Sequence, residues 1–166
     1  KNKKGIDALN TVGDAREISK RKLPKMVWDF IDGGADGELS VAANRRSLNE
    51  IQLLPRFLKD VSNRDISIKI FGERTELPFI LSPSGMATIA HPQGELAVAK
   101  AAGNCGAIFC VSTASGYTLE EIAEASNARL WFQLYLWGNE EVVNSLIDRA
   151  GKSGYEALVV TVDVPV

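Results

Sequence analysis

An alternation of short apolar runs and helix-like segments, from residue 77 onwards, constrains the fold more than any other feature of the sequence. Four apolar runs begin near residues 78, 107, 130 and 157: PFILSPSG, AIFCVST, RLWFQLYL and ALVVTVDVP. Helical periodicity characterises the segments between them: GELAVAKAAGNCG, TLEEIAEASN and NEEVVNSLIDRAGKSGY. Strands alternating with helices at this pitch form right-handed βαβ units, and runs that are apolar throughout suit parallel strands. We therefore predict an α/β fold built on a parallel sheet.

The first part of the chain has a different pattern. Residues 14–50 are expected to form helices, one of them in PKMVWDFIDGG, with Pro24 at its first position and a glycine pair at its end. The next segment, ADGELSVAANRRSLNEI, continues with apolar residues at steps of three and four. In ISIKIFGERTELPFIL, isoleucines alternate with polar residues before a turn region that begins at Gly72, which predicts a hairpin.

The apolar runs alone do not decide whether the sheet stays open or closes into a barrel. Four parallel strands can make a small open sheet, or the first half of an eight-stranded barrel, which needs about 250 residues. A parallel sheet cut after the fourth strand exposes a hydrophobic edge. We therefore expect these 166 residues to be part of a longer molecule or to be completed by a second fragment.

Composition narrows the function classes. Hydrophobic residues make up 45% and charged residues 24%, a soluble globular balance, and the net charge of −2 provides no basic field for nucleic acid. No apolar run reaches the ~18–20 residues that span a bilayer, and KNKKGIDALN lacks the apolar core of a signal peptide, so a cytoplasmic location is expected. Cys110 lies in an apolar run and is expected in the core, whereas Cys105 and the single histidine, His91, are too few ligands for a metal site.

Polar residues gather where the predicted strands end. In α/β barrels the carboxyl ends of the strands build the active site. Gln133 and Tyr135 are two residues apart and share one face of their strand, and Thr161 and Asp163 repeat that spacing one strand later. Neutral donors and acceptors on a shared face suit a flat polar heterocycle, although polar residues also simply end strands. No phosphate loop or GxGxxG is present, and His91 lies in a loop-like HPQG, which leaves no Ser-His-Asp set.

The chain resembles the FMN-dependent 2-hydroxy-acid oxidases and dehydrogenases, which include glycolate oxidase, the flavin lactate dehydrogenases and mandelate dehydrogenase. Four stretches carry the resemblance: LPKMVWDFIDGGADGE, LPFILSPSGMATIAHPQGELAVAKAA, LWFQLY and TVDVP. It runs across nearly all of the 166 residues but covers only the N-terminal half of the family's domain. It implies a TIM (β/α)8 barrel of which residues 1–166 form a single domain, with N-terminal helices and a hairpin in 1–75 and strands 1–4 in 76–166.

The resemblance also implies site residues. The family binds FMN at the mouth of the barrel, and the Pro83-Ser84-Gly85 turn matches the backbone that lies along the flavin ring. The side chains that match hydrogen-bonding partners of the ring are Ser112, Gln133 and Thr161. Tyr135 matches a tyrosine near the reacting hydroxyl and carboxylate of the substrate. Asp163 matches an aspartate that orients the catalytic histidine and stabilises its charged form.

Two departures from the family pattern matter. Phe30 stands where the family carries a tyrosine that helps to hold the substrate carboxylate, and the lost charge-assisted hydrogen bond is worth ~1.5–3 kcal/mol. A larger or more apolar 2-hydroxy acid is therefore expected at this site. The family's catalytic histidine, substrate-binding arginines, flavin lysine and phosphate site match no position in these residues, so we expect the segment alone to be inactive without the C-terminal half of the barrel.

The resemblance further implies a homotetramer that oxidises an (S)-2-hydroxy acid to the 2-oxo acid and passes electrons from FMN to oxygen or another acceptor. Two alternatives stay open at this level. One is a non-catalytic half-barrel that binds or assembles without chemistry, and the other is a different FMN barrel enzyme, such as an isomerase.

Overall fold

The computed structural model describes residues 9–163, which fall into two compact units divided after Val61, residues 9–61 and 62–163. Residues 1–8, at the start of the KNKKGIDALN segment, and residues 164–166, which include the last two residues of the TVDVP stretch, lie outside the described part. Each unit is described by itself. The predicted division of a single domain at residues 75 and 76 stays a prediction.

The first unit is helical. Its helices are α1 (Val12–Lys22), α2 (Lys25–Asp32) and α3 (Leu39–Asn49). Thr11 and Asp14 form a capping box that starts α1 two residues earlier than expected, because each side chain accepts the other's backbone N–H. Pro24 is the N-cap of α2 instead of its first helical residue, since its ψ of 143° is extended. Gly33 ends α2 as expected.

The second unit begins with the predicted hairpin. Its strands are β1 (Ile68–Ile70) and β2 (Glu73–Thr75), which pair antiparallel. Phe71 and Gly72 form the turn, with φ of 54° and 84°. Two residues with positive φ give the turn type whose twist matches that of the flanking strands. Phe71 holds this conformation against its steric cost while its ring packs 5.3 Å from that of Trp131.

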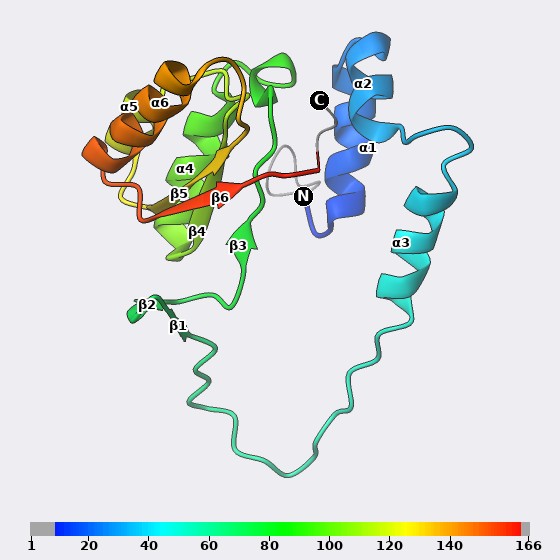
Figure 1. Ribbon diagram of the computed structural model, residues 1–166. Helices are drawn as coiled ribbons and strands as arrows, with labels where there is room; N and C mark the ends of the chain where they lie inside the picture. Colours follow the sequence, from blue (N-terminus) through cyan, green and yellow to red (C-terminus); the bar gives the residue numbers. More distant parts are fainter. Residues whose placement is uncertain (1–8, 164–166) are drawn as a thin grey trace. The chain divides into compact units, whose positions relative to one another are not determined.

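The α/β prediction is confirmed by a four-stranded parallel sheet in the order β3-β4-β5-β6 (Figure 1). The strands are β3 (Ile80–Leu81), β4 (Ile108–Ser112), β5 (Arg129–Leu134) and β6 (Ala157–Val160). Between them lie a 3-10 turn, η2 (Ala87–Ile89), and helices α4 (Gly94–Cys105), α5 (Leu119–Ala125) and α6 (Glu140–Lys152). The strand expected over residues 78–85 is shorter because the chain leaves the ladder before Pro83, which has no N–H to donate.

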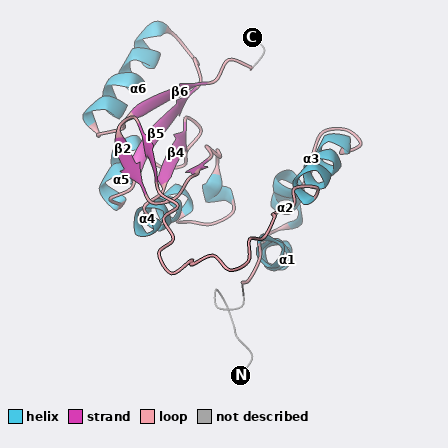
Figure 2. Ribbon diagram, turned by 90° about the horizontal axis from the view of Figure 1, so that it is seen from below, coloured by secondary structure: helices cyan, strands magenta, loops and turns pink. Residues whose placement is uncertain are grey.

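The sheet has two chemically different faces. On one face the buried residues of β4 and β5 pack against α4, α5 and α6, which lie along that side of the sheet (Figure 2). This core includes Phe109, Val111, Leu130, Phe132 and Leu134, all at most 4% exposed. Because side chains alternate along a strand, the other face carries the intervening residues, which end in polar groups.

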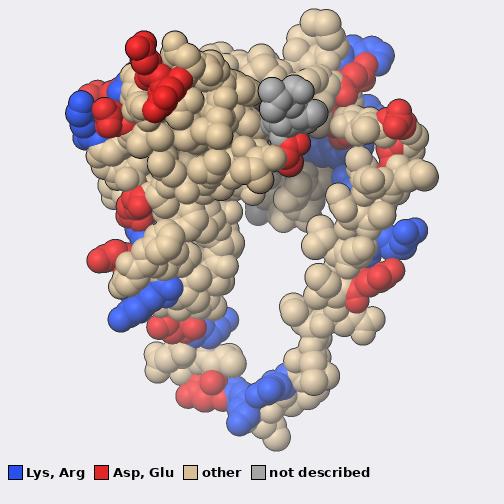
Figure 3. All heavy atoms as spheres, in the orientation of Figure 1, with Lys and Arg blue, Asp and Glu red and all other residues tan. Residues whose placement is uncertain are grey.

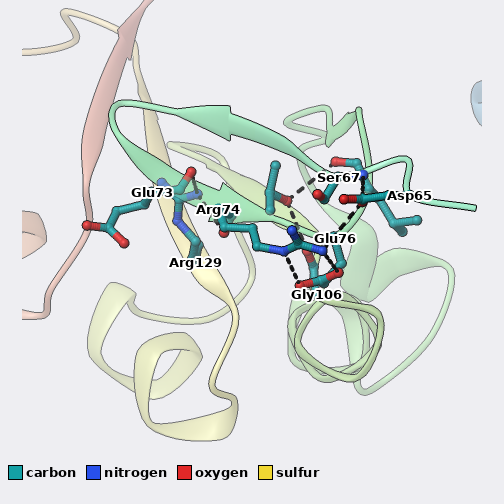
Figure 4. A network of polar contacts seen from close by, with 9 residues as sticks. Asp65, Ser67, Glu73, Arg74, Glu76, Gly106 and Arg129 are labelled. Atoms are coloured by element: carbon teal, nitrogen blue, oxygen red, sulfur yellow. Dashed lines mark hydrogen bonds and ion pairs between the residues drawn. The ribbon is translucent and has the colours of Figure 1, made fainter. Parts of the chain in front are cut away.

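Arg129, at the amino end of β5, ties the hairpin to the sheet (Figure 4). Its guanidinium donates to the carbonyl oxygens of Ile70 at 3.1 Å and Glu73 at 3.3 Å, and it pairs with the Glu156 carboxylate at 2.6 Å. The Thr75 hydroxyl donates to the carbonyl of Gly106 at 2.9 Å. The hairpin therefore covers the amino ends of the strands, opposite the ends where polar residues gather.

On the face shown in Figure 3, acidic and basic side chains of the described residues lie interspersed. In residues 9–163 no helix has the length and apolar character needed to cross a membrane.

Candidate functional site

Three neighbouring strands bring their polar carboxyl ends together. Strand pairing places Ser112, the last residue of β4, beside Gln133 of β5. Thr161 follows β6, and its backbone N–H donates to the carbonyl of Leu134 at 3.0 Å. The predicted trio of Ser112, Gln133 and Thr161 therefore lies at one end of the sheet, on the face away from the helices.

The Gln133 side chain links the trio directly. Its Oε1 accepts hydrogen bonds from the Ser112 hydroxyl at 3.2 Å and from the Thr113 backbone N–H at 3.3 Å, and its Nε2 donates to the Thr161 hydroxyl at 2.7 Å. Gln133 is 3% exposed and Ser112 5% exposed. Buried amides and hydroxyls that are hydrogen-bonded to one another hold defined positions, so this network is pre-organised.

The network also fixes which hydrogen atoms remain for a ligand. A backbone N–H can only donate, so the Gln133 atom facing Thr113 must be the oxygen, and the amide nitrogen must face Thr161. That nitrogen has a second N–H, and the Thr161 hydroxyl keeps its own hydrogen. The Ser112 hydroxyl donates to Gln133 and accepts from Ala114 N at 3.1 Å. The arrangement therefore offers donors from β5 and β6 to a ligand with carbonyl or ring-nitrogen acceptors.

The Pro83-Ser84-Gly85 turn lies beside this network. The backbone N–H of Met86 donates to the Ala114 carbonyl at 2.8 Å, which holds the turn against the end of β4. A Cβ on Gly85 would come within 2.9 Å of the Ala114 Cβ, closer than side-chain atoms pack. Pro83 and Ser84 are exposed, as a backbone surface open to a ligand would be.

Tyr135 is held by Thr113, the residue that follows β4. Its backbone N–H donates to the Thr113 hydroxyl at 3.0 Å, and that hydroxyl donates to the Gln133 carbonyl at 2.6 Å. The half-buried Tyr135 ring stacks on Trp137, with ring centroids 4.6 Å apart and planes 8° from parallel. Sequence reasoning missed Trp137, although its two-residue spacing from Tyr135 is the same signal that paired Gln133 with Tyr135.

The remaining predicted residues are not joined to the network by any contact the structure gives. Asp163 is exposed, three residues beyond the end of β6. Phe30 belongs to the first unit, on α2, with a side chain 64% exposed. The roles expected for both residues stay predictions.

His91 and the two cysteines, Cys105 and Cys110, lie in surroundings that indicate no catalytic or metal-binding role among the described residues. His91 is exposed, and its Nδ1 accepts the backbone N–H of Gln93 at 3.1 Å, which makes it a turn residue. Cys110 is buried as expected, and burial raises the pKa of its thiol to about 11, so the thiol is neutral at physiological pH. Cys105 is exposed. Within residues 9–163, no group of three or more His, Cys, Asp or Glu side chains is placed to hold a metal ion.

A hollow of about 290 Å³ lies near the end of β4, but on the other side of the sheet. Its lining includes Tyr117, Phe132, Leu146 and Arg149, which belong to the helical face. Ser112 and Thr113 also line it, so it adjoins the end of the network, although Gln133 itself is not part of its lining.

A family model described as FMN-dependent dehydrogenase matches residues 19–166. Among curated proteins, the chain is 39% identical over 160 residues to a peroxisomal (S)-2-hydroxyacid oxidase of Arabidopsis thaliana, covering 96% of this chain and 44% of that protein. It is 40% identical over 157 residues to an L-lactate dehydrogenase of Pseudomonas syringae, covering 95% of this chain and 41% of that protein. The chain thus spans less than half the length of these relatives.

Solved structures match in the same region. A soluble mutant of the membrane-associated (S)-mandelate dehydrogenase from Pseudomonas putida superimposes with a TM-score of 0.88 at 37% identity, covering 95% of this chain and 45% of that one. A mandelate oxidase with (S)-4-hydroxymandelic acid superimposes with a TM-score of 0.87 at 39% identity, covering 95% and 44% of the two chains. The chain is therefore similar to these proteins in both structure and sequence over nearly all of its length.

Proposed function

Because this chain belongs to the FMN-dependent dehydrogenase family, we propose that it supplies the flavin-ring side of an enzyme that oxidises an (S)-2-hydroxy acid to the 2-oxo acid. The observation that carries the proposal is the bonded network of Ser112, Gln133 and Thr161 at the carboxyl ends of three parallel strands. Active sites of α/β barrels are built at these ends.

The residues of the network fit the ring of FMN. The spare N–H of Gln133 and the Thr161 hydroxyl suit the carbonyl and ring-nitrogen acceptors of a flavin. Gly85 lets the turn pack closely against Ala114, and Pro83 and Ser84 of the turn are exposed. FMN, when bound, supplies the acceptor for the two electrons that leave the substrate. The chain's own contribution is to orient the ring and to fix its hydrogen bonds.

Substrate contacts are proposed for Tyr135 and Asp163. The Tyr135 hydroxyl would contact the reacting hydroxyl or carboxylate of the hydroxy acid. Asp163 would hold and orient a histidine base supplied by the C-terminal half of the barrel, which would also supply the phosphate site. A carboxylate beside an imidazole fixes its tautomer and raises its basicity. The electron acceptor after FMN is left open, and a homotetramer in the cytoplasm is part of the proposal.

The proposed substrate has a large or apolar side chain. Phe30 lacks the hydroxyl that its family counterpart gives to the carboxylate, and Trp137, 50% exposed, adds an aromatic surface next to Tyr135. Both aromatic side chains favour apolar contact with a large substrate over polar contact with a small one.

The test is flavin reduction in the full-length protein that contains these residues. We expect the purified protein to carry FMN and its visible absorbance to bleach when (S)-mandelate or (S)-lactate is added without oxygen, with mandelate reacting faster than glycolate. Residues 1–166 alone are expected to leave the flavin oxidised. A colourless protein that takes up no FMN would refute the cofactor, and a clear preference for glycolate would refute the proposed substrate class.

A further inference from the structure

Glu95 is a buried carboxylate that the proposed reaction does not use. It is the second residue of α4 and is 1% exposed. Its Oε1 accepts the backbone N–H of Ala87 at 3.1 Å, while its Oε2 has no hydrogen-bond partner among the described residues. Burying a carboxylate with one oxygen unsatisfied is costly for a fold, and such departures are expected where function needs them.

Ala87, whose N–H the Glu95 carboxylate accepts, lies directly after the Pro83-Ser84-Gly85 turn and Met86. Ala87 begins η2, two residues after Gly85, and Met86 between them is left-handed, with φ of 55°. A non-glycine residue in this conformation is strained and persists only where its neighbours hold it. Two bonds do so, from Met86 N to the Ala114 carbonyl at 2.8 Å and from Ala87 N to Glu95.

The packing around η2 makes this attachment stiff. A Cβ on Gly94 would meet the Thr88 backbone nitrogen at 3.1 Å, and a Cβ on Gly116 would meet the Thr88 side chain at 2.4 Å. α4 and the loop after β4 therefore close on η2 from two sides. A displacement of the Glu95 carboxylate cannot be absorbed by loose packing, so it is transmitted along the backbone to the turn.

We propose that Glu95 is a positioning residue for the flavin turn: its carboxylate fixes the backbone at Ala87 and thereby the Pro83-Ser84-Gly85 segment against which the ring would lie. The inference rests on the proposed FMN site. It accounts for the glutamate of the HPQGE stretch, whose histidine has only a turn role.

The test compares Glu95→Ala and Glu95→Gln in the full-length protein, with FMN affinity, the absorbance spectrum of bound FMN and its midpoint potential as readouts. Glutamine keeps an oxygen for Ala87 N–H, and alanine does not. We expect Glu95→Ala to weaken FMN binding about tenfold and to shift the spectrum, and Glu95→Gln to stay within about twofold of the wild type. Glu121→Ala is the control for loss of a helix-capping bond alone, because the exposed Glu121 also accepts a backbone N–H near a helix start, from Thr118 at 2.9 Å.

Outcomes separate the two proposals. If the wild type binds FMN and Glu95→Ala keeps its affinity, spectrum and potential, the positioning role is wrong and the proposed function stands. If the wild type takes up no FMN, both are wrong. Should Glu95→Ala not fold, Glu95→Asp decides in its place, because aspartate keeps the charge but is one methylene shorter. A native spectrum with aspartate and an altered one with glutamine would also overturn the inference.

Discussion

Removing the Gln133 amide tests the central network most directly. In Gln133→Leu, a side chain of similar size replaces the amide, and three hydrogen bonds disappear, to Ser112, Thr113 and Thr161. The partly buried Thr113 N–H loses the hydrogen bond that it donates to the Gln133 oxygen. An unsatisfied buried donor costs about 1–3 kcal/mol, and the added apolar contact of leucine offsets part of this. We therefore expect the free energy of unfolding to fall by about 1–2 kcal/mol.

A double-mutant cycle with Thr161→Val isolates one bond of the network. The Gln133 Nε2 to Thr161 hydroxyl distance of 2.7 Å is the shortest of the three contacts made by this amide. Valine keeps the shape of threonine, and once Gln133 is gone the threonine hydroxyl has lost this donor. The two changes should therefore be less than additive, with a coupling energy of about 1 kcal/mol.

The assay is urea unfolding of the full-length apoprotein for the wild type, both single variants and the double variant, followed by FMN titration of each. FMN affinity should fall in both single variants, because each removes a donor assigned to the ring. Additivity of the unfolding free energies to within about 0.3 kcal/mol would refute the reasoning, since it would mean that the two side chains do not interact.

Three further predictions concern other parts of the second unit. Gly85→Ala should weaken FMN binding about tenfold, because the new Cβ lies 2.9 Å from that of Ala114 and the turn must shift. Glu120 has its pKa lowered from 4.5 to about 2, chiefly by its hydrogen bond to Arg149, so its stabilising effect is complete above pH 4.5 and is lost as the pH falls towards 2. Acid titrations of unfolding should thus converge for the wild type and Glu120→Gln over that range. Trp137→Ala should lower kcat/KM for mandelate relative to lactate by a factor of about 2–10, the value of one aromatic contact.

Controls make these predictions specific. Gly151→Ala adds a Cβ where no atom lies within 4 Å, so FMN affinity should not change. If it weakens binding as much as the substitution at Gly85, the close approach is not the cause. If the free energies of unfolding of the wild type and Glu120→Gln differ by the same amount from pH 5 to 2, the ion pair with Arg149 is not the source of the stabilisation. An unchanged mandelate-to-lactate ratio would exclude a substrate contact for Trp137.

Sequence pattern predicted the parallel sheet and the edge at which polar residues gather. The spacing of the apolar runs predicts parallel strands, and two-residue spacing predicts that Gln133 and Tyr135 share a face. The hydrogen bond between Gln133 and Thr161 was not predicted, although parallel strands do bring their carboxyl ends to the same edge. Local chemistry moved the boundaries, as at Pro83, where the absent N–H ends the ladder earlier than the apolar run does.

Contacts that depend on folding were beyond the sequence. Glu95 reads as an ordinary acidic residue in the first turn of a helix, and only the fold shows that it is buried against Ala87. The stacking of Trp137 needs the actual course of the chain after β5. The strand-end pattern singled out Asp163, but its role was predicted from the resemblance, and its exposed position gives no independent support for that role.

The attachment of the hairpin by Arg129 divides the strands into two ends with different tolerance to change. At the amino ends, backbone carbonyls and a carboxylate surround the Arg129 guanidinium, so replacing it leaves several polar groups without their partner. At the carboxyl ends, exposed side chains such as Trp137 take no part in this anchor or in the buried Gln133 network. Mutation of exposed rim residues can therefore change what the rim contacts without first compromising the integrity of the scaffold, and the relatives that this chain resembles are named for different acids.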